Sequence, residues 1–202
     1  MFDCVMPAAG ASSRMGDLKP LLPFAGSTLV EAAVGAALDA GCRVLLVVGN
    51  RGAEVASPFG TEAHRAARER GRFLVVDNPN WERGLLGSIQ AALSLVVGDA
   101  FFLAHADMPF IESVDYRALA EARAERTSNG LADAAFFASH DGVRGHPVLL
   151  PSAWIPEMLA LDARGMMKDF LADRPIALVE TGRGALRDID TPEDYEAAME
   201  GP

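Results

Sequence analysis

The chain has 202 residues, of which 50% are hydrophobic and 23% charged, and its 28 acidic and 18 basic side chains give a formal net charge of -10. This composition excludes global disorder, and the acidity argues against a non-specific nucleic-acid binder, which needs a cationic face. No apolar stretch reaches the ~18 residues that span a bilayer, so we expect a cytoplasmic protein without a membrane partner.

Short apolar runs alternate with longer helical patterns along the chain. The predicted strands cover residues 2–7, 43–48, 73–76, 100–104, 134–139, 148–150, 176–179 and 186–189. The predicted helices cover residues 28–40, 61–70, 85–96, 113–126, 153–161 and 166–173, and a last helix follows Thr191. This alternation predicts an α/β protein, a three-layer α/β/α sandwich with a mainly parallel sheet. No linker divides the chain, so we expect a single domain over residues 1–202.

Local signals mark two helix starts and two core thiols. Thr28 and Glu31 have the spacing of a capping box, and Thr191 precedes a proline that suits the first turn of a helix. Cys4 and Cys42 lie beside apolar strand-like runs, so we expect both to be buried thiols. In parallel sheets, ligands bind beyond the carboxyl ends of the strands, and the chemistry is expected in the loops there.

The loop over residues 8–16 follows the first predicted strand and is rich in glycine, alanine and serine. Small residues let backbone N–H groups approach a phosphate. The loop is not a dinucleotide fingerprint, because Ser12 stands where the second glycine belongs, and it lacks the Gly-Lys-Ser/Thr of a P-loop. Arg14 and Lys19 are either solvated surface charges or clamps for a phosphate, and their place behind this loop favours clamps.

Acidic residues follow two further predicted strands. Asp107 comes just after the run 100–104, where it is either a solvated turn acid or a metal ligand. Asp188 and Asp190 are two residues apart, so on a strand both would point to one face. Asp190 could instead simply precede the Thr191 cap.

The remaining candidates lie in loops. Trp81 either covers a planar ring or pins its loop, and His146, taken alone, suits a hydrogen-bonded loop histidine. The other histidines have no zinc-ligand spacing, so we assign them no metal.

Taken in order, these segments resemble the signature of the MobA-like nucleotidyltransferases, and the resemblance covers essentially the whole chain. Within that family they are most similar to the branch that transfers CMP from CTP to molybdopterin in molybdenum cofactor biosynthesis. The matching segments are AAGASSRMG at 8–16, Lys19, LLPF at 21–24, VVGN at 47–50, NPNWERGL at 78–85, DMP at 107–109, GHPV at 145–148 and DIDTPEDY at 188–195.

The resemblance implies a Rossmann-like fold of the glycosyltransferase A type and a nucleotidyltransferase that releases pyrophosphate. GTP-using relatives carry a second glycine where this chain has Ala9, which favours CTP. The resemblance also implies magnesium, held by Asp107 and Asp190, and catalytic roles for Arg14, Lys19 and Asp107. The nucleotide-binding residues it implies are Ala8, Ala9, Gly10, Arg14, Lys19, Asn78, Gly84 and Ser88. It places His146 and Arg164 at the acceptor.

Two departures from the family pattern bear on these expectations. Pro7 replaces an aliphatic residue and removes a backbone donor before the first loop. The turn at 161–165 only partly matches the family's acceptor turn. Two alternatives therefore stay open: a sugar phosphate or alcohol phosphate as acceptor, or a nucleotide-binding chaperone of a molybdenum hydroxylase that does not turn over. In the favoured function, a molybdenum hydroxylase would receive the product.

Overall fold

A computed structural model describes residues 1–10, 18–128 and 133–200 of the chain. Its centre is a seven-stranded sheet of order β5-β4-β1-β6-β8-β7-β9. β8 pairs antiparallel with both of its neighbours, whereas the other pairings are parallel. The strands are β1 Asp3–Pro7, β4 Arg43–Val48, β5 Phe73–Asp77, β6 Ala100–Leu103, β7 Ala135–His140, β8 Val143–Pro151 and β9 Ile176–Glu180, and a separate hairpin joins β2 Pro23–Phe24 to β3 Ser27–Thr28.

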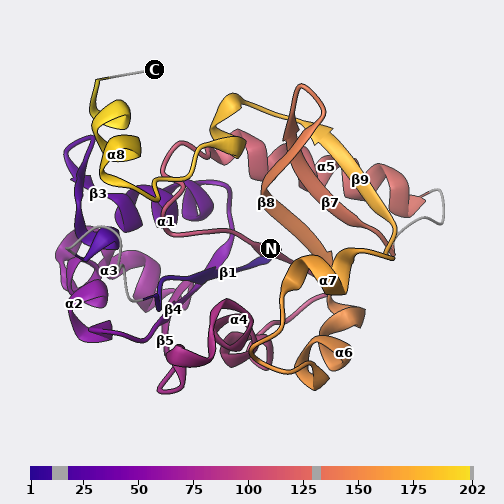
Figure 1. Ribbon diagram of the computed structural model, residues 1–202, viewed down its shortest axis with the longest axis horizontal. Helices are drawn as coiled ribbons and strands as arrows, with labels where there is room; N and C mark the ends of the chain where they lie inside the picture. The colour runs from indigo at the N-terminus through magenta and orange to yellow at the C-terminus, as the bar shows by residue number, and fades with distance from the viewer. Residues whose placement is uncertain (11–17, 129–132, 201–202) are drawn as a thin grey trace.

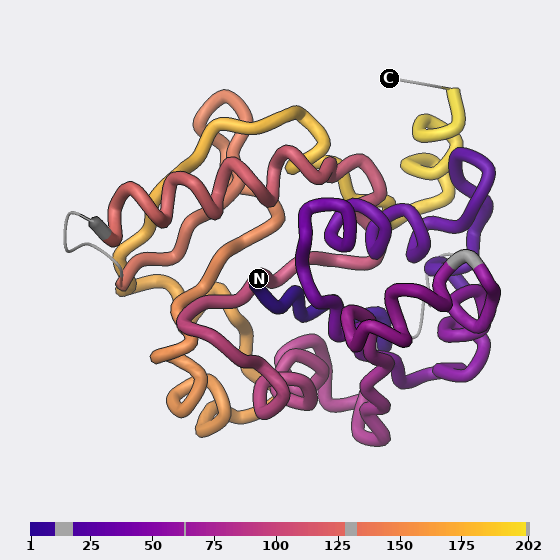
Figure 2. Tube along the Cα trace, turned by 180° about the vertical axis from the view of Figure 1, so that it is seen from behind, coloured from indigo at the N-terminus to yellow at the C-terminus, as the bar shows by residue number. Residues whose placement is uncertain are grey.

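Helices cover both faces of this sheet, as Figures 1 and 2 show. α1 and α5 lie on one face, over a buried cluster that includes Val34, Phe102 and Tyr116. α4, α6 and α7 lie on the other, over a cluster that includes Leu103 and Met158. The helices are α1 Leu29–Asp39, α2 Gly52–Ala56, α3 Glu62–Glu69, α4 Leu85–Leu93, α5 Ser113–Ser128, α6 Ile155–Ala160, α7 Met167–Leu171 and α8 Pro192–Met199. The expected three-layer sandwich with a mainly parallel sheet is confirmed.

Both predicted helix starts are present. The Thr28 hydroxyl accepts from the backbone N–H of Glu31, whose carboxylate accepts from the N–H of Thr28. Thr191 and Asp194 form the same reciprocal pair at the start of α8. Such caps satisfy backbone donors that a first helical turn leaves unpaired.

Cys4 and Cys42 are both buried free thiols, as expected. Burial raises the pKa of Cys42 to about 12, although the nearby Arg72 guanidinium acts against it. In the part of the chain that the structure describes, no helix is long and apolar enough to cross a membrane.

The expected strand at 186–189 is wrong. Residues Arg183–Leu186 form a 3-10 helix, and the segment after it joins no sheet. Ile189 is nevertheless buried, since it packs with Leu29 and Ala198. Buried apolar residues alone do not distinguish a strand from a buried loop, so the argument that places Asp188 and Asp190 on one strand face does not hold.

Other parts of the fold also differ from expectation. β8 is far longer than the expected run 148–150. The prediction is too short because the first half of β8 includes Arg144, Gly145 and Pro147, residue types that are depleted in strands or interrupt them. The helix expected over 85–96 ends at Leu93, where single-turn hydrogen bonds follow. The expected elements also do not include the β2–β3 hairpin or α2, which the structure contains.

Candidate active site

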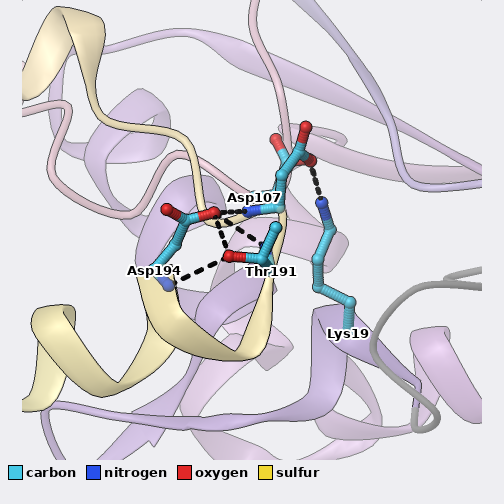
Figure 3. Close-up of polar contacts among 5 residues, drawn as sticks. Lys19, Asp107, Thr191 and Asp194 are labelled. Atoms are coloured by element: carbon cyan, nitrogen blue, oxygen red, sulfur yellow. Dashed lines mark hydrogen bonds and ion pairs between the residues drawn. The ribbon is translucent and has the colours of Figure 1, made fainter.

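Lys19 joins two carboxylates that come from distant parts of the chain. Its Nζ donates to Oδ2 of Asp107 at 2.6 Å and to Oδ1 of Asp190 at 2.7 Å, as Figure 3 shows for the Asp107 contact. Lys19 opens a 3-10 helix of three residues, Lys19–Leu21. Asp107 follows β6, and Asp190 precedes α8. The structure therefore gathers three of the expected site residues at the carboxyl end of the central strands.

Backbone contacts hold the two acidic loops side by side. The N–H of Ile189 donates to the carbonyl of Asp107 at 3.0 Å. The N–H of Asp190 donates to the Asp194 carboxylate at 3.0 Å, so the capping box of α8 also fixes the residue before it (Figure 3). The Tyr195 hydroxyl donates to the carbonyl of Pro23 at 2.7 Å and ties α8 to the hairpin that follows Lys19.

The charges make Lys19 a fixed cation. Burial alone would lower the pKa of Lys19, but the attraction and hydrogen bonds of Asp107 and Asp190 outweigh it and raise that pKa above its ordinary value. The Lys19 side chain is 14% exposed, against 23% for Asp107 and 45% for Asp190. The ammonium is thus partly shielded from water, whereas the Asp190 carboxylate beside it is half exposed.

Two histidines adjoin this cluster. The rings of His105 and His146 lie 4.2 Å apart, and Nδ1 of His146 is 3.5 Å from the carbonyl of Leu103. Burial lowers the pKa of His105, while Asp107 acts against it, and burial together with His105 lowers the pKa of His146 to about 3. Both rings are therefore neutral at neutral pH. The structure brings His146 to the site through His105, which the sequence patterns did not single out.

The expected nucleotide loop is bonded within itself. Asn78 and Ser88 are buried, and the Asn78 amide donates to the Ser88 hydroxyl at 3.1 Å. That hydroxyl donates to the carbonyl of Gly84 at 3.3 Å. Gly84 has a φ of 108°, a conformation that glycine adopts without strain, and it begins α4. The Asn78 and Ser88 side chains thus hold the loop in shape. Backbone N–H groups at the start of α4 are the groups that this loop could present to a ligand.

Trp81 lies over the ends of β1 and β4. A Cβ at Gly49 would overlap the Cβ of Trp81 and would stand 3.0 Å from the Cβ of Ala9, which is itself buried. Trp81 therefore pins its loop against Gly49, one of the two alternatives for this residue. Ala8 lies beside these residues, its N–H donating to the carbonyl of Val47.

Other expected site residues are placed less centrally. Arg14 falls in the range 11–17, outside the described residues. Gly10 is the last described residue before that range and is exposed. Arg164 is exposed on a turn that rests on the start of α4, where the carbonyl of Ala163 accepts from the N–H of Gly87. Gly145, part of the GHPV segment, has a packing role, since a Cβ there would overlap the carbonyl of Ala185.

Comparison with known proteins decides the family. The model of the MobA-like NTP transferase domain matches residues 4–179. The chain belongs to the MobA-like NTP transferase family. It is a nucleotidyltransferase.

Individual relatives agree with this assignment. This MobA-like chain is 30% identical over 199 residues to the molybdenum cofactor cytidylyltransferase of Escherichia coli (strain K12), a match that covers 98% of this chain and 95% of that protein. A nucleotidyl transferase from Methanothermobacter has the same fold, with a TM-score of 0.77 at 23% identity over 99% of this chain and 96% of that chain. The Rv0371c protein of Mycobacterium tuberculosis H37Rv, solved in complex with manganese, has a TM-score of 0.72 at 20% identity, covering 100% of this chain and 99% of that one.

The MobA-like site has donors that suit a divalent cation. Oδ1 of Asp107 is buried and has no hydrogen-bond partner among the described residues. A buried carboxylate oxygen without a partner is costly, and a cation would satisfy it. Within the same residues no group of three acidic, histidine or cysteine side chains could hold a metal alone. Two carboxylates supplemented by substrate phosphates and water suit Mg²⁺, which keeps several non-protein ligands. The residues present therefore fit the expected ion.

Proposed function

We propose that this nucleotidyltransferase transfers CMP from CTP to the phosphate of molybdenum-bound molybdopterin and releases pyrophosphate. The observation that carries the proposal is the Lys19 cation held between Asp107 and Asp190 at the ligand-binding edge of the sheet. The Escherichia coli relative, which matches nearly the full length of both chains, supports the choice of nucleotide and acceptor.

The reaction makes one bond and breaks one. An oxygen of the acceptor phosphate attacks the α-phosphorus of CTP, and the bond from that phosphorus to the bridging oxygen of the β-phosphate breaks. The acceptor phosphate is ionised near neutral pH, so no strong general base is required. Catalysis then rests on positioning and on neutralising the charge of the phosphates.

Lys19 would supply a large part of that neutralisation. Its ammonium stays charged because Asp107 and Asp190 raise its pKa, and the same two contacts hold the flexible side chain in one place. A cation that is already oriented needs no reorganisation when charge develops on the phosphates. Arg14, in the preceding loop, remains a proposed second clamp.

Asp107 and Asp190 would hold the magnesium ion. When bound, the ion would neutralise phosphate charge and polarise the reacting phosphate. Oδ1 of Asp107, which is buried and has no hydrogen-bond partner in the described part of the chain, supports its role as a ligand.

Base recognition would take place around Ala9. Its methyl group stands beside Gly49, under the Trp81 loop, so the pocket at this point is narrower than one with glycine in place of Ala9. A narrower pocket favours the smaller pyrimidine base, although one methyl contact is worth only ~1–3 kcal/mol. The start of α4, at Gly84, would offer backbone donors to the nucleotide.

Pyrophosphate release tests the proposal. Wild-type protein is assayed with CTP, GTP, ATP and UTP, each with molybdopterin, with sugar phosphates and alcohol phosphates, and without an acceptor. Release that requires CTP and molybdopterin is expected, and Ala9→Gly should relax the preference for CTP over GTP. Equal or better turnover with GTP contradicts the proposed base. Release only with another phosphate contradicts the proposed acceptor, and retention of CTP without release indicates a chaperone of a molybdenum hydroxylase.

A further inference from the structure

The turn at residues 161–165 is fastened to α4. The N–H of Gly87, in the first turn of that helix, donates to the carbonyl of Ala163 at 3.2 Å. The Leu86 side chain packs close to the turn, since a Cβ at Gly165 would stand 3.5 Å from Cδ2 of Leu86. The turn itself is closed by the N–H of Gly165, which donates to the carbonyl of Asp162 at 2.7 Å.

A single side chain adds the second attachment. Nε2 of Gln90 donates to the carbonyl of Met158 at 2.8 Å and to that of Leu161 at 3.0 Å. Both N–H groups of the amide thereby donate to carbonyls at the end of α6. The last carbonyls of a helix have no donor within the helix, so these two contacts satisfy them. The opposite amide orientation would turn an oxygen toward two acceptors, so the contacts fix how Gln90 lies.

The same helix shapes the expected nucleotide loop. Ser88, which lies between Gly87 and Gln90 on α4, forms hydrogen bonds with Asn78 and Gly84. The start of α4 thus contacts both the nucleotide loop and the 161–165 turn. Neither attachment of the turn involves the cluster around Lys19.

We infer that Gln90 is a positioning residue for acceptor binding, which it serves by holding the 161–165 turn, and with it Arg164, at a fixed place on α4. This rests on the proposed function and on the expectation from the family resemblance that Arg164 lies at the phosphorylated acceptor. The Asp162 carboxylate accepts from the backbone N–H of Arg164 at 3.0 Å, so the orientation of Arg164 depends on the turn that Gln90 anchors. Gln90 itself need not touch the substrate.

The test separates acceptor binding from nucleotide binding. Gln90→Met keeps an unbranched side chain of similar length and removes both donors, and Gln90→Glu keeps the shape but turns an acceptor toward the two carbonyls. Pyrophosphate release is measured against molybdopterin at saturating CTP, and against CTP at saturating molybdopterin. Losing two hydrogen bonds should raise the KM for molybdopterin roughly tenfold in Gln90→Met and further in Gln90→Glu. The KM for CTP should stay within about twofold in both.

A matched control lies on α6. Glu157→Gln removes an ion pair in which Oε2 of Glu157 lies 2.5 Å from Nη2 of Arg174. The substitution leaves the Gln90 contacts in place. It should leave both KM values unchanged. Equal rises in the KM for CTP and for molybdopterin, or no change in either, would overturn the positioning role. Should wild type use another phosphate from the acceptor panel, the proposed acceptor is wrong and the same variants are compared with that phosphate. Should wild type release no pyrophosphate with any acceptor, both proposals are overturned.

Discussion

Lys19→Met tests the cation at the centre of the site. The substitution keeps a long side chain and removes the charge, leaving Asp107 and Asp190 facing each other without the ammonium between them. A hydrogen bond to a charged group is worth about 1.5–3 kcal/mol, and exposed ion pairs are worth only about 0–1 kcal/mol. The contact of Lys19 with Asp107, which is 23% exposed, should therefore contribute about 1.5 kcal/mol to stability. The contact with Asp190, which is 45% exposed, should contribute less than about 1 kcal/mol. The expected loss in the free energy of unfolding is therefore about 2 kcal/mol.

The assay is urea unfolding at pH 7, and the chain offers a matched control. Lys168, the only other lysine of the sequence, is exposed on α7, so Lys168→Met should change stability little. Mg²⁺ should restore part of the stability of Lys19→Met, because an ion that binds the folded state alone stabilises it. The same variant should also weaken CTP binding.

The pH dependence follows from the direction of the Lys19 shift. A folded-state pKa raised above its ordinary value of 10.5 means that the folded protein holds this proton more tightly than the unfolded chain. The stabilisation that the Lys19 proton provides is therefore complete at pH values below 10.5, and it is lost as the pH rises through the raised pKa of the folded protein. The stability difference between wild type and Lys19→Met should stay constant around neutrality and shrink in strong alkali. Equal stabilities of Lys19→Met and Lys168→Met at pH 7 would refute the reasoning.

Three further outcomes are expected. Asp107→Asn should lower pyrophosphate release roughly a hundredfold at limiting Mg²⁺, whereas Asp188→Asn, at an exposed position, should change it little; full activity of Asp107→Asn contradicts the metal assignment. Gly49→Ala should displace Trp81, which its new Cβ would overlap, lowering the free energy of unfolding by about 1–3 kcal/mol and raising the KM for CTP. His146 has a pKa of about 3 against an ordinary 6.5, so its contribution is complete above 6.5 and is lost as pH falls toward 3. His146→Gln should flatten that acid slope in urea unfolding, and an unchanged slope counts against the buried neutral ring.

The regular parts of the fold were predictable because the local signals agree with the tertiary structure. The buried strand β4 is apolar throughout after Arg43, and the Thr28 and Thr191 caps carry their partners at the required spacing. The segment 186–189 misled because Ile189 is buried as a strand residue would be, yet its N–H bonds to a loop carbonyl at Asp107. Periodicity reports burial and does not say where the backbone hydrogen bonds go.

The site was predictable in its residue types and less so in its contacts. Asp107 and Lys19 could be selected from their positions after a strand and a small-residue loop. That Lys19 joins Asp107 to Asp190 could not, because the contact spans 171 residues and depends on where α8 packs. His105 and Gln90 belong to no motif. The His105 ring lies tilted against the ring of His146, and Gln90 binds two carbonyls at the end of α6. Spacing along the chain holds no information about either.

The dependence of the site on α8 has a consequence during synthesis. Lys19 is synthesised 171 residues before its partner Asp190 and the helix α8 that anchors it. Domains form as their segments emerge, so the sheet can assemble around β1, β4 and β6 before the acidic partner exists. Over that interval the half-buried Lys19 lacks its contact with Asp190. A nascent chain is therefore expected to become competent to bind nucleotide only once Asp190 and α8 have emerged, and a stop codon placed before Asp190 should yield a folded sheet without the Lys19 cluster.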